Sequence, residues 1–98
     1  MSPSPALRAL RCLVAGRVQG VYYRAATAAR AQQLGVHGSV RNLPDGRVEV
    51  IVKGGAAEIA ELATWLWQGP PAARVEAVDM EEWLAPVAEG FVVSKEPV

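Results

Sequence analysis

The spacing of apolar residues along the chain predicts alternating strands and helices. Val48, Val50 and Val52 alternate with polar residues, which is the pattern of a strand buried on one face. Ile59 and Leu62 instead begin a stripe at the three- and four-residue spacing of an amphipathic helix. The same reasoning along the whole chain predicts strands over 7–15, 36–43, 47–53 and 73–83, a short last strand over 91–93, and helices over 22–34 and 56–67.

Glycine and proline separate these elements. Gly16 and Gly20 bound a short segment that we expect to be a loop between the first strand and the first helix. Gly35 follows that helix at the position that favours a left-handed backbone. The residues Leu-Pro-Asp-Gly at 43–46 predict the turn of a β-hairpin, since proline fixes φ and glycine tolerates a positive φ.

The order strand-helix-strand-strand-helix-strand predicts an α+β fold, a ferredoxin-like βαββαβ sandwich. It comprises a four-stranded antiparallel sheet with both helices on one face. We expect the first and third strands to pair in parallel, which leaves the second strand at one edge with its end near the loop 16–20. Residues 1–6 are expected to be a flexible tail, and residues 7–98 a single domain.

Composition narrows the choice of partners. Ten basic and ten acidic residues in the 98-residue chain give a formal net charge of +0, which argues against sequence-independent binding to nucleic acid. A single cysteine and a single histidine exclude an internal disulfide and a histidine-cluster metal site, so no metal or cofactor is expected. No apolar run is long enough to span a bilayer. We expect a cytoplasmic monomer without a membrane partner.

The junction of the first strand and first helix carries the candidate chemistry. Backbone N–H groups of a glycine-bounded loop and of a helix N-terminus can together bind an anion. Arg24 lies in the first turn of that helix, where the helix dipole disfavours a cation by roughly 0.3–1 kcal/mol. A bound anion would remove this conflict. The alternative is an ordinary loop followed by a solvated arginine.

Asn42 is the second candidate. It ends the second strand, directly before the predicted turn. Its carboxamide could accept from and donate to a water molecule beside a bound phosphate. The alternative is an asparagine that only stabilises the turn.

Two segments resemble the signatures of a known family. Residues 14–24, VAGRVQGVYYR, resemble the signature loop of the acylphosphatases, and 38–42, GSVRN, followed by 45–49, DGRVE, look like its second signature. The resemblance covers about residues 7–93. Tyr23 stands where the family more often has Phe, and Ser39 where it usually has an aromatic residue or Met.

The resemblance implies hydrolysis of a small-molecule acyl phosphate to a carboxylate and inorganic phosphate. It assigns phosphate binding to Arg24 and orientation of the attacking water to Asn42. The remaining phosphate oxygens would be held by the loop that follows the first strand, whose residues are Gly16, Arg17, Val18, Gln19, Gly20, Val21 and Tyr22. The alternative function is a ferredoxin-like module that binds an anion or RNA without catalysis.

Overall fold

Seven elements make up the chain in the computed structural model, which describes residues 7–94. The predicted tail at 1–6 lies outside the described residues. None of the described helices is long and apolar enough to cross a membrane. The elements are β1 Leu7–Arg17, α1 Tyr23–Leu34, β2 His37–Asn42, β3 Val48–Gly55, α2 Ala56–Gln68, β4 Arg74–Glu82 and β5 Phe91–Val93.

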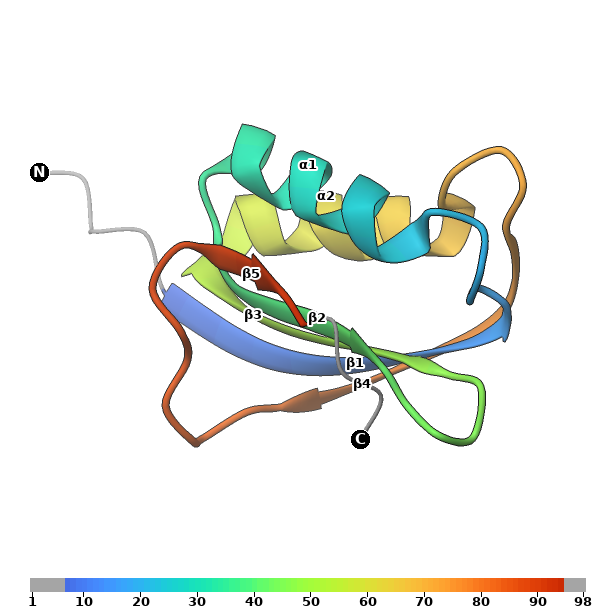
Figure 1. The fold of residues 1–98 in the computed structure, drawn as a ribbon. Coiled ribbons are helices and arrows are strands. Elements are labelled where there is room, and N and C mark those ends of the chain that lie inside the picture. The colour runs from blue at the N-terminus through green and yellow to red at the C-terminus, as the bar shows by residue number, and fades with distance from the viewer. Residues whose placement is uncertain (1–6, 95–98) are drawn as a thin grey trace, which may run out of the picture.

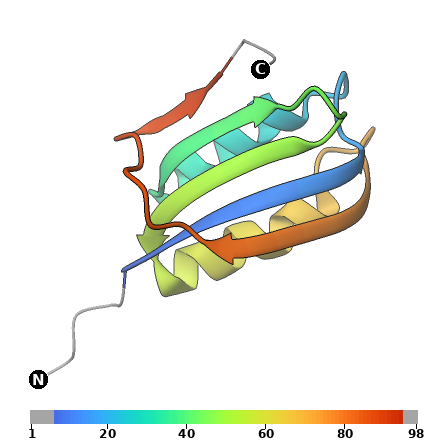
Figure 2. The same cartoon turned by 90° about the horizontal axis from the view of Figure 1, so that it is seen from below.

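Both helices cover one face of a single twisted sheet (Figure 1), as the sequence predicts. The sheet itself differs from the prediction. It has five strands in the order β4-β1-β3-β2-β5, which Figure 2 shows from the face that the helices leave open. The short β5 pairs in parallel with β2, so the prediction of four antiparallel strands is wrong and the sheet is mixed.

The expected parallel pairing of the first and third strands is also wrong, because β1 and β3 are antiparallel. The crossover through α1 returns β2 parallel to β1 with one strand position left between them. The hairpin then places β3, which is antiparallel to β2, in that position. The second strand is not at an edge, since β5 covers its other side. As a consequence β1, β2 and β5 run in the same direction, and their C-terminal ends lie at the same end of the sheet.

The core lies between the sheet and the two helices. The alternating residues Leu10, Cys12 and Val14 of β1 are buried there, as are the three valines of β3. Burial raises the pKa of the Cys12 thiol to about 11, so this side chain stays protonated and unreactive at neutral pH. From α2, Leu62 and Leu66 complete the packing.

Strand β1 extends two residues beyond its predicted end. Gly16 therefore lies in the strand rather than in a loop, with φ 125°. The register of the β1–β4 pair shifts between Ala15 and Gly16, and a Cβ atom on Gly16 would overlap the Arg74 carbonyl of β4. This glycine is needed because another backbone approaches closely.

Candidate active site

The ends of three strands and the start of one helix lie together at one end of the sheet. The segment 18–22, here called the first loop, leaves β1 and enters α1. Asn42 is the last residue of β2, and Val93 is the last residue of β5. They meet because β1, β2 and β5 run in the same direction, and the N-terminus of α1 lies above the same end of the sheet (Figure 1). Backbone donors, a cation and a carboxamide are thus brought together from distant parts of the chain.

Two left-handed residues shape the first loop. Gly20 has φ 75°, and Tyr22, the N-cap of α1, has φ 63° and ψ 20°. Tyr22 is the one non-glycine residue with a positive φ among those described, and this conformation costs a tyrosine roughly 1–2 kcal/mol. Left-handed residues alternating with other conformations turn successive N–H groups toward one side, an arrangement that binds anions. Buried Val18 and Val21 anchor the loop in the core.

The backbone N–H groups of the first loop are free to bind a ligand. Within the described part of the chain, no carbonyl or side chain accepts a hydrogen bond from a backbone N–H of residues 18–22. The N-terminus of α1 has no side-chain cap and no acidic residue in its first turn. These donors and the positive end of the helix dipole are therefore available to an anion.

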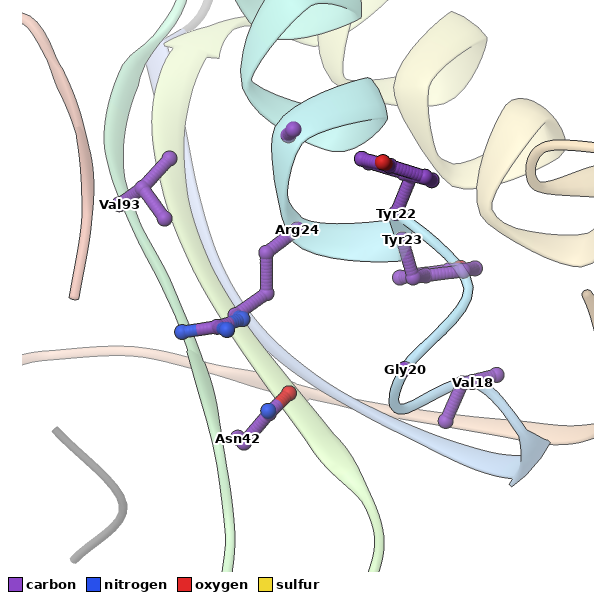
Figure 3. Close-up of a pocket in the computed structure, with 8 residues that line it drawn as sticks. Val18, Gly20, Tyr22, Tyr23, Arg24, Asn42 and Val93 are labelled. Atoms are coloured by element: carbon purple, nitrogen blue, oxygen red, sulfur yellow. The ribbon is translucent and has the colours of Figure 1, made fainter. Parts of the chain in front are cut away.

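A cavity of about 480 Å³ lies at this convergence. Figure 3 shows the Arg24 guanidinium extending from α1 toward the side chain of Asn42. The Nη1 atom of Arg24 donates a 2.6 Å hydrogen bond to the Ser94 carbonyl, which holds the half-buried guanidinium in this direction. The Oδ1 atom of Asn42 is buried and has no hydrogen-bond partner within residues 7–94. The cavity is lined by Val18, Gly20, Tyr22, Tyr23, Arg24, Ala25, Asn42 and Val93.

The predicted site residues fall into two groups. Arg24, Asn42 and three first-loop residues, Val18, Gly20 and Tyr22, line the cavity. The others do not line it: Gly16 and Arg17 belong to β1, Val21 is buried in the core, and Gln19 directs its side chain elsewhere. Sequence reasoning did not place Tyr23, Ala25 or Val93 at the site. The short strand predicted over 91–93 includes the last of these, but nothing in the sequence placed it at the site.

The side chain of Gln19 joins the first loop to the β2–β3 turn, residues 43–47. Its Nε2 atom donates to the carbonyls of Leu43 and Arg47, each at 2.9 Å. Since Leu43 follows Asn42 directly, this contact fixes the end of β2 relative to the loop amides.

Tyr23, at the first position of α1, connects this end of the helix to α2. Its hydroxyl donates to the carbonyl of Leu66 in the last turn of α2. The helical partner of that carbonyl would be the N–H of residue 70, but residue 70 is proline and has none. The hydroxyl therefore satisfies an acceptor that α2 itself cannot. Burial raises the pKa of Tyr23 far above its ordinary value, so it remains a donor.

Comparisons with known proteins agree with the sequence resemblance. The family model described as Acylphosphatase matches residues 10–93. An acylphosphatase of Nitrosococcus oceani is 51% identical over 84 residues, which is 86% of this chain and 94% of that protein. One of Xanthomonas oryzae pv. oryzae is 52% identical over 86 residues, or 88% of this chain and 98% of that protein.

Comparison with a solved structure agrees with these sequence matches. The structure of an acylphosphatase from Coxiella burnetii superposes with a TM-score of 0.85 at 36% identity, covering 90% of this chain and 93% of that one. The fold and the converging site therefore define a small α+β hydrolase. The chain belongs to the acylphosphatase family, and the enzyme hydrolyses acyl phosphates.

Proposed function

We propose that the phosphate group of an acyl phosphate occupies the 480 Å³ cavity, with Arg24 binding it and Asn42 orienting the attacking water. The observation that carries this proposal is the common cavity. It is lined by an arginine and by an asparagine whose buried Oδ1 atom has no hydrogen-bond partner within residues 7–94, beside a loop whose backbone N–H groups make no hydrogen bonds within the same residues. The first loop acts through its backbone N–H groups, and Val18, Gly20 and Tyr22 are its residues that line the cavity.

Arg24 supplies the charge that the anion requires. A guanidinium carries five N–H donors, and one of its nitrogens already donates to Ser94. Its remaining donors can contact two phosphate oxygens at once, because the planar guanidinium directs pairs of N–H groups in the same direction. The bound anion also offsets the unfavourable position of this cation at the N-terminus of α1.

Asn42 acts on the water rather than on the phosphate. Its Oδ1 atom accepts a hydrogen bond from the water and directs the oxygen lone pair toward phosphorus. A carboxamide does not titrate, so it can position the water but cannot remove its proton. The substrate phosphate accepts that proton instead.

The leaving group explains why so few side chains suffice. As the water oxygen bonds to phosphorus, the bond from phosphorus to the acyl oxygen breaks and its electrons leave with the carboxylate. Carboxylic acids have pKa values of roughly 4–5, so the departing oxygen needs no proton donor. Phosphoryl transfer then requires mainly positioning and stabilisation of charge, which Arg24 and the loop amides provide.

The proposal includes the remaining expectations from the sequence. The enzyme works as a cytoplasmic monomer, uses no metal or other cofactor, and has no nucleic-acid or membrane partner. Acyl phosphate is the substrate and inorganic phosphate one of the products.

A comparison of leaving groups tests this proposal. Phosphate release is measured with benzoyl phosphate and with phenyl phosphate, before and after treatment with a chelator. We expect rapid hydrolysis of benzoyl phosphate, unaffected by the chelator. Phenyl phosphate should react at least about 1,000-fold more slowly, because a phenolate of pKa about 10 is a poor leaving group without an acid. Comparable rates on both substrates, or loss of activity on chelation, would contradict the proposed mechanism.

A further inference from the structure

The two ends of the sheet differ in charge, although the chain has a formal net charge of +0. The site end, defined here as residues 15–25, 42–48 and 68–76, is the end where β1, β2 and α2 finish and α1 begins (Figure 1). Its charged residues are four arginines and two acids, namely Arg17, Arg24, Arg47, Arg74, Asp45 and Glu76. At the opposite end, residues 7–9, 34–38, 52–60 and 82–91, acids outnumber cations, with Glu58, Glu82 and Glu89 against Arg8 and Lys53. The cavity therefore lies at the positive end of the molecule.

Arg17 and Arg74 differ from the other arginine of a turn, Arg47, in having no acidic partner. Arg47 forms a 2.8 Å ion pair with Asp45. Arg17 and Arg74 are exposed, and no acidic side chain within residues 7–94 forms an ion pair with either of them. This includes Glu76, which follows Arg74 by two residues. The positive charge of the two side chains is therefore available to a ligand.

The pairing of β1 with β4 places Arg17 directly opposite Arg74. Opposite residues of an antiparallel pair project to the same side of the sheet, where two like charges destabilise the pairing. An acidic residue at either position would replace this repulsion with an attraction. The stability of the fold thus gives no reason for two arginines here.

Both arginines lie close to the cavity without lining it. Arg17 directly precedes the lining residue Val18, so their Cα atoms are about 3.8 Å apart. Opposite Cα atoms of an antiparallel pair, such as those of Arg17 and Arg74, are about 4.5–5.5 Å apart. These spacings put both charges within roughly 10–15 Å of a phosphate in the cavity. Because the Debye length is about 30 Å at 0.01 M salt, both charges act on that phosphate at low ionic strength.

We propose that Arg17 and Arg74 attract the anionic substrate to the cavity through space and so raise kcat/KM without contacting the bound phosphate. This inference rests on the proposed function, which puts the phosphate in the cavity. A phosphate group with one substituent carries about two negative charges near neutral pH, so each arginine attracts it. The total charge of substrate and water is the same in the transition state, so both states are stabilised equally. The attraction therefore lowers KM and leaves kcat unchanged.

The experiment measures kcat and KM for benzoyl phosphate, and the dissociation constant of inorganic phosphate, at two ionic strengths. At about 0.01 M the double variant Arg17→Gln, Arg74→Gln should show a kcat/KM about three- to tenfold below that of the wild-type enzyme. Phosphate should bind more weakly by a similar factor, and kcat should not change. At about 1 M, where the Debye length is about 3 Å, the two enzymes should agree within about 1.5-fold.

Two further double variants separate charge from other effects. Arg17→Lys, Arg74→Lys keeps the charge but not the planar guanidinium, so it should keep the wild-type kcat/KM. Arg8→Gln, Lys53→Gln removes the same charge from two exposed residues at the opposite end, and should change kcat/KM by less than about twofold at low salt. Urea unfolding should show no loss of stability in Arg17→Gln, Arg74→Gln, since a repulsion has been removed.

Three results would overturn the inference and leave the proposed function intact. They are an equal fall of kcat/KM in the two glutamine double variants, a fall in the lysine double variant as large as that in Arg17→Gln, Arg74→Gln, and a fall that persists at about 1 M salt. Failure of the wild-type enzyme to hydrolyse benzoyl phosphate or to bind inorganic phosphate would instead overturn the proposed function.

Discussion

The side-chain amide of Gln19 donates a 2.9 Å hydrogen bond to the carbonyl oxygen of Leu43, 24 residues further along the chain. The same nitrogen donates to Arg47. Each of these carbonyls also accepts a backbone hydrogen bond within the β2–β3 turn. The contribution of Gln19 is therefore to hold the first loop against the end of β2, where Asn42 lies, rather than to satisfy otherwise unpaired acceptors.

Replacing Gln19 with alanine should thus affect turnover more than folding. We expect kcat for benzoyl phosphate to fall about tenfold or more, because Asn42 is no longer fixed relative to the phosphate. The free energy of unfolding should fall by only about 1–2 kcal/mol, the value of two neutral hydrogen bonds. Steady-state kinetics and urea unfolding measure the two effects. Gln32→Ala, on the exposed side of α1, is the control. A large loss of stability with unchanged kcat would show that Gln19 serves the fold alone.

Gly16 and Gly20 should differ in their tolerance of alanine, although both lie in the segment 14–24 that resembles the signature loop. A Cβ on Gly16 would overlap the backbone of β4, so Gly16→Ala should destabilise the protein by about 3 kcal/mol or more. A Cβ on Gly20 meets no atom within 4 Å, so only its left-handed φ of 75° opposes alanine there. Gly20→Ala should therefore cost about 1–2 kcal/mol. Thermal or urea unfolding measures the loss of stability in each variant, and equal losses in the two would contradict this prediction.

Tyr23→Phe removes the hydroxyl that pairs with the Leu66 carbonyl. Because Pro70 cannot replace this donor, the carbonyl is left without its partner, and the free energy of unfolding should fall by about 1–3 kcal/mol. Replacing Pro70 with alanine supplies an N–H group at residue 70, the position where a continued helix would place the donor to Leu66. The double variant Tyr23→Phe, Pro70→Ala should recover part of the loss, as a double-mutant cycle measures. Independent, additive effects of the two substitutions would argue against this explanation.

Glu49 is a buried carboxylate on the open face of the sheet, between Arg11 and Arg41. Arg11 Nε lies 2.7 Å from one carboxylate oxygen, and Arg41 Nε lies 2.6 Å from the other. Burial alone would raise the pKa of Glu49, but hydrogen bonds from Arg41 and Arg11 outweigh it and hold the pKa below the ordinary value. The alternating strand pattern predicts that Glu49 points outward, but it does not predict burial, which depends on arginines from two other strands.

The lowered pKa gives stability a defined pH dependence. The carboxylate stabilises the fold above the pKa of an unfolded glutamate, about 4.3, and this contribution is lost as the pH falls through the lower folded pKa. Glu49→Gln should lower the free energy of unfolding at pH 7 by about 1–3 kcal/mol and flatten its decline in acid. Glu61→Gln, at an exposed pair with 3.8 Å between Arg30 and Glu61, should change little. An equally steep acid decline in Glu49→Gln would refute this assignment.

The sequence predicts the two helices and the first four strands because their hydrophobic periodicity is clear. The pairing of the strands is harder to predict from the sequence. The place of β5 beside β2 depends on a tertiary contact that the three residues Phe91–Val93 cannot encode locally. For the site, Arg24 and Asn42 are assigned through the resemblance of two segments to the signatures of the acylphosphatases, and both line the cavity. Val93 could not be assigned to the cavity without that same strand pairing. The side-chain contact of Gln19 likewise requires knowing that two loops share one edge of the sheet.

The most direct test of the account separates binding from turnover at Arg24 and Asn42. The dissociation constant for inorganic phosphate and kcat for benzoyl phosphate are measured in the wild-type enzyme, in Arg24→Ala and in Asn42→Ala. We expect Arg24→Ala to weaken phosphate binding by about tenfold or more, since it removes a charged two-pronged contact. Asn42→Ala should lower kcat by about 100-fold while phosphate binding changes less than about threefold. Loss of phosphate affinity in Asn42→Ala as large as in Arg24→Ala, or full phosphate affinity in Arg24→Ala, would contradict the division of roles.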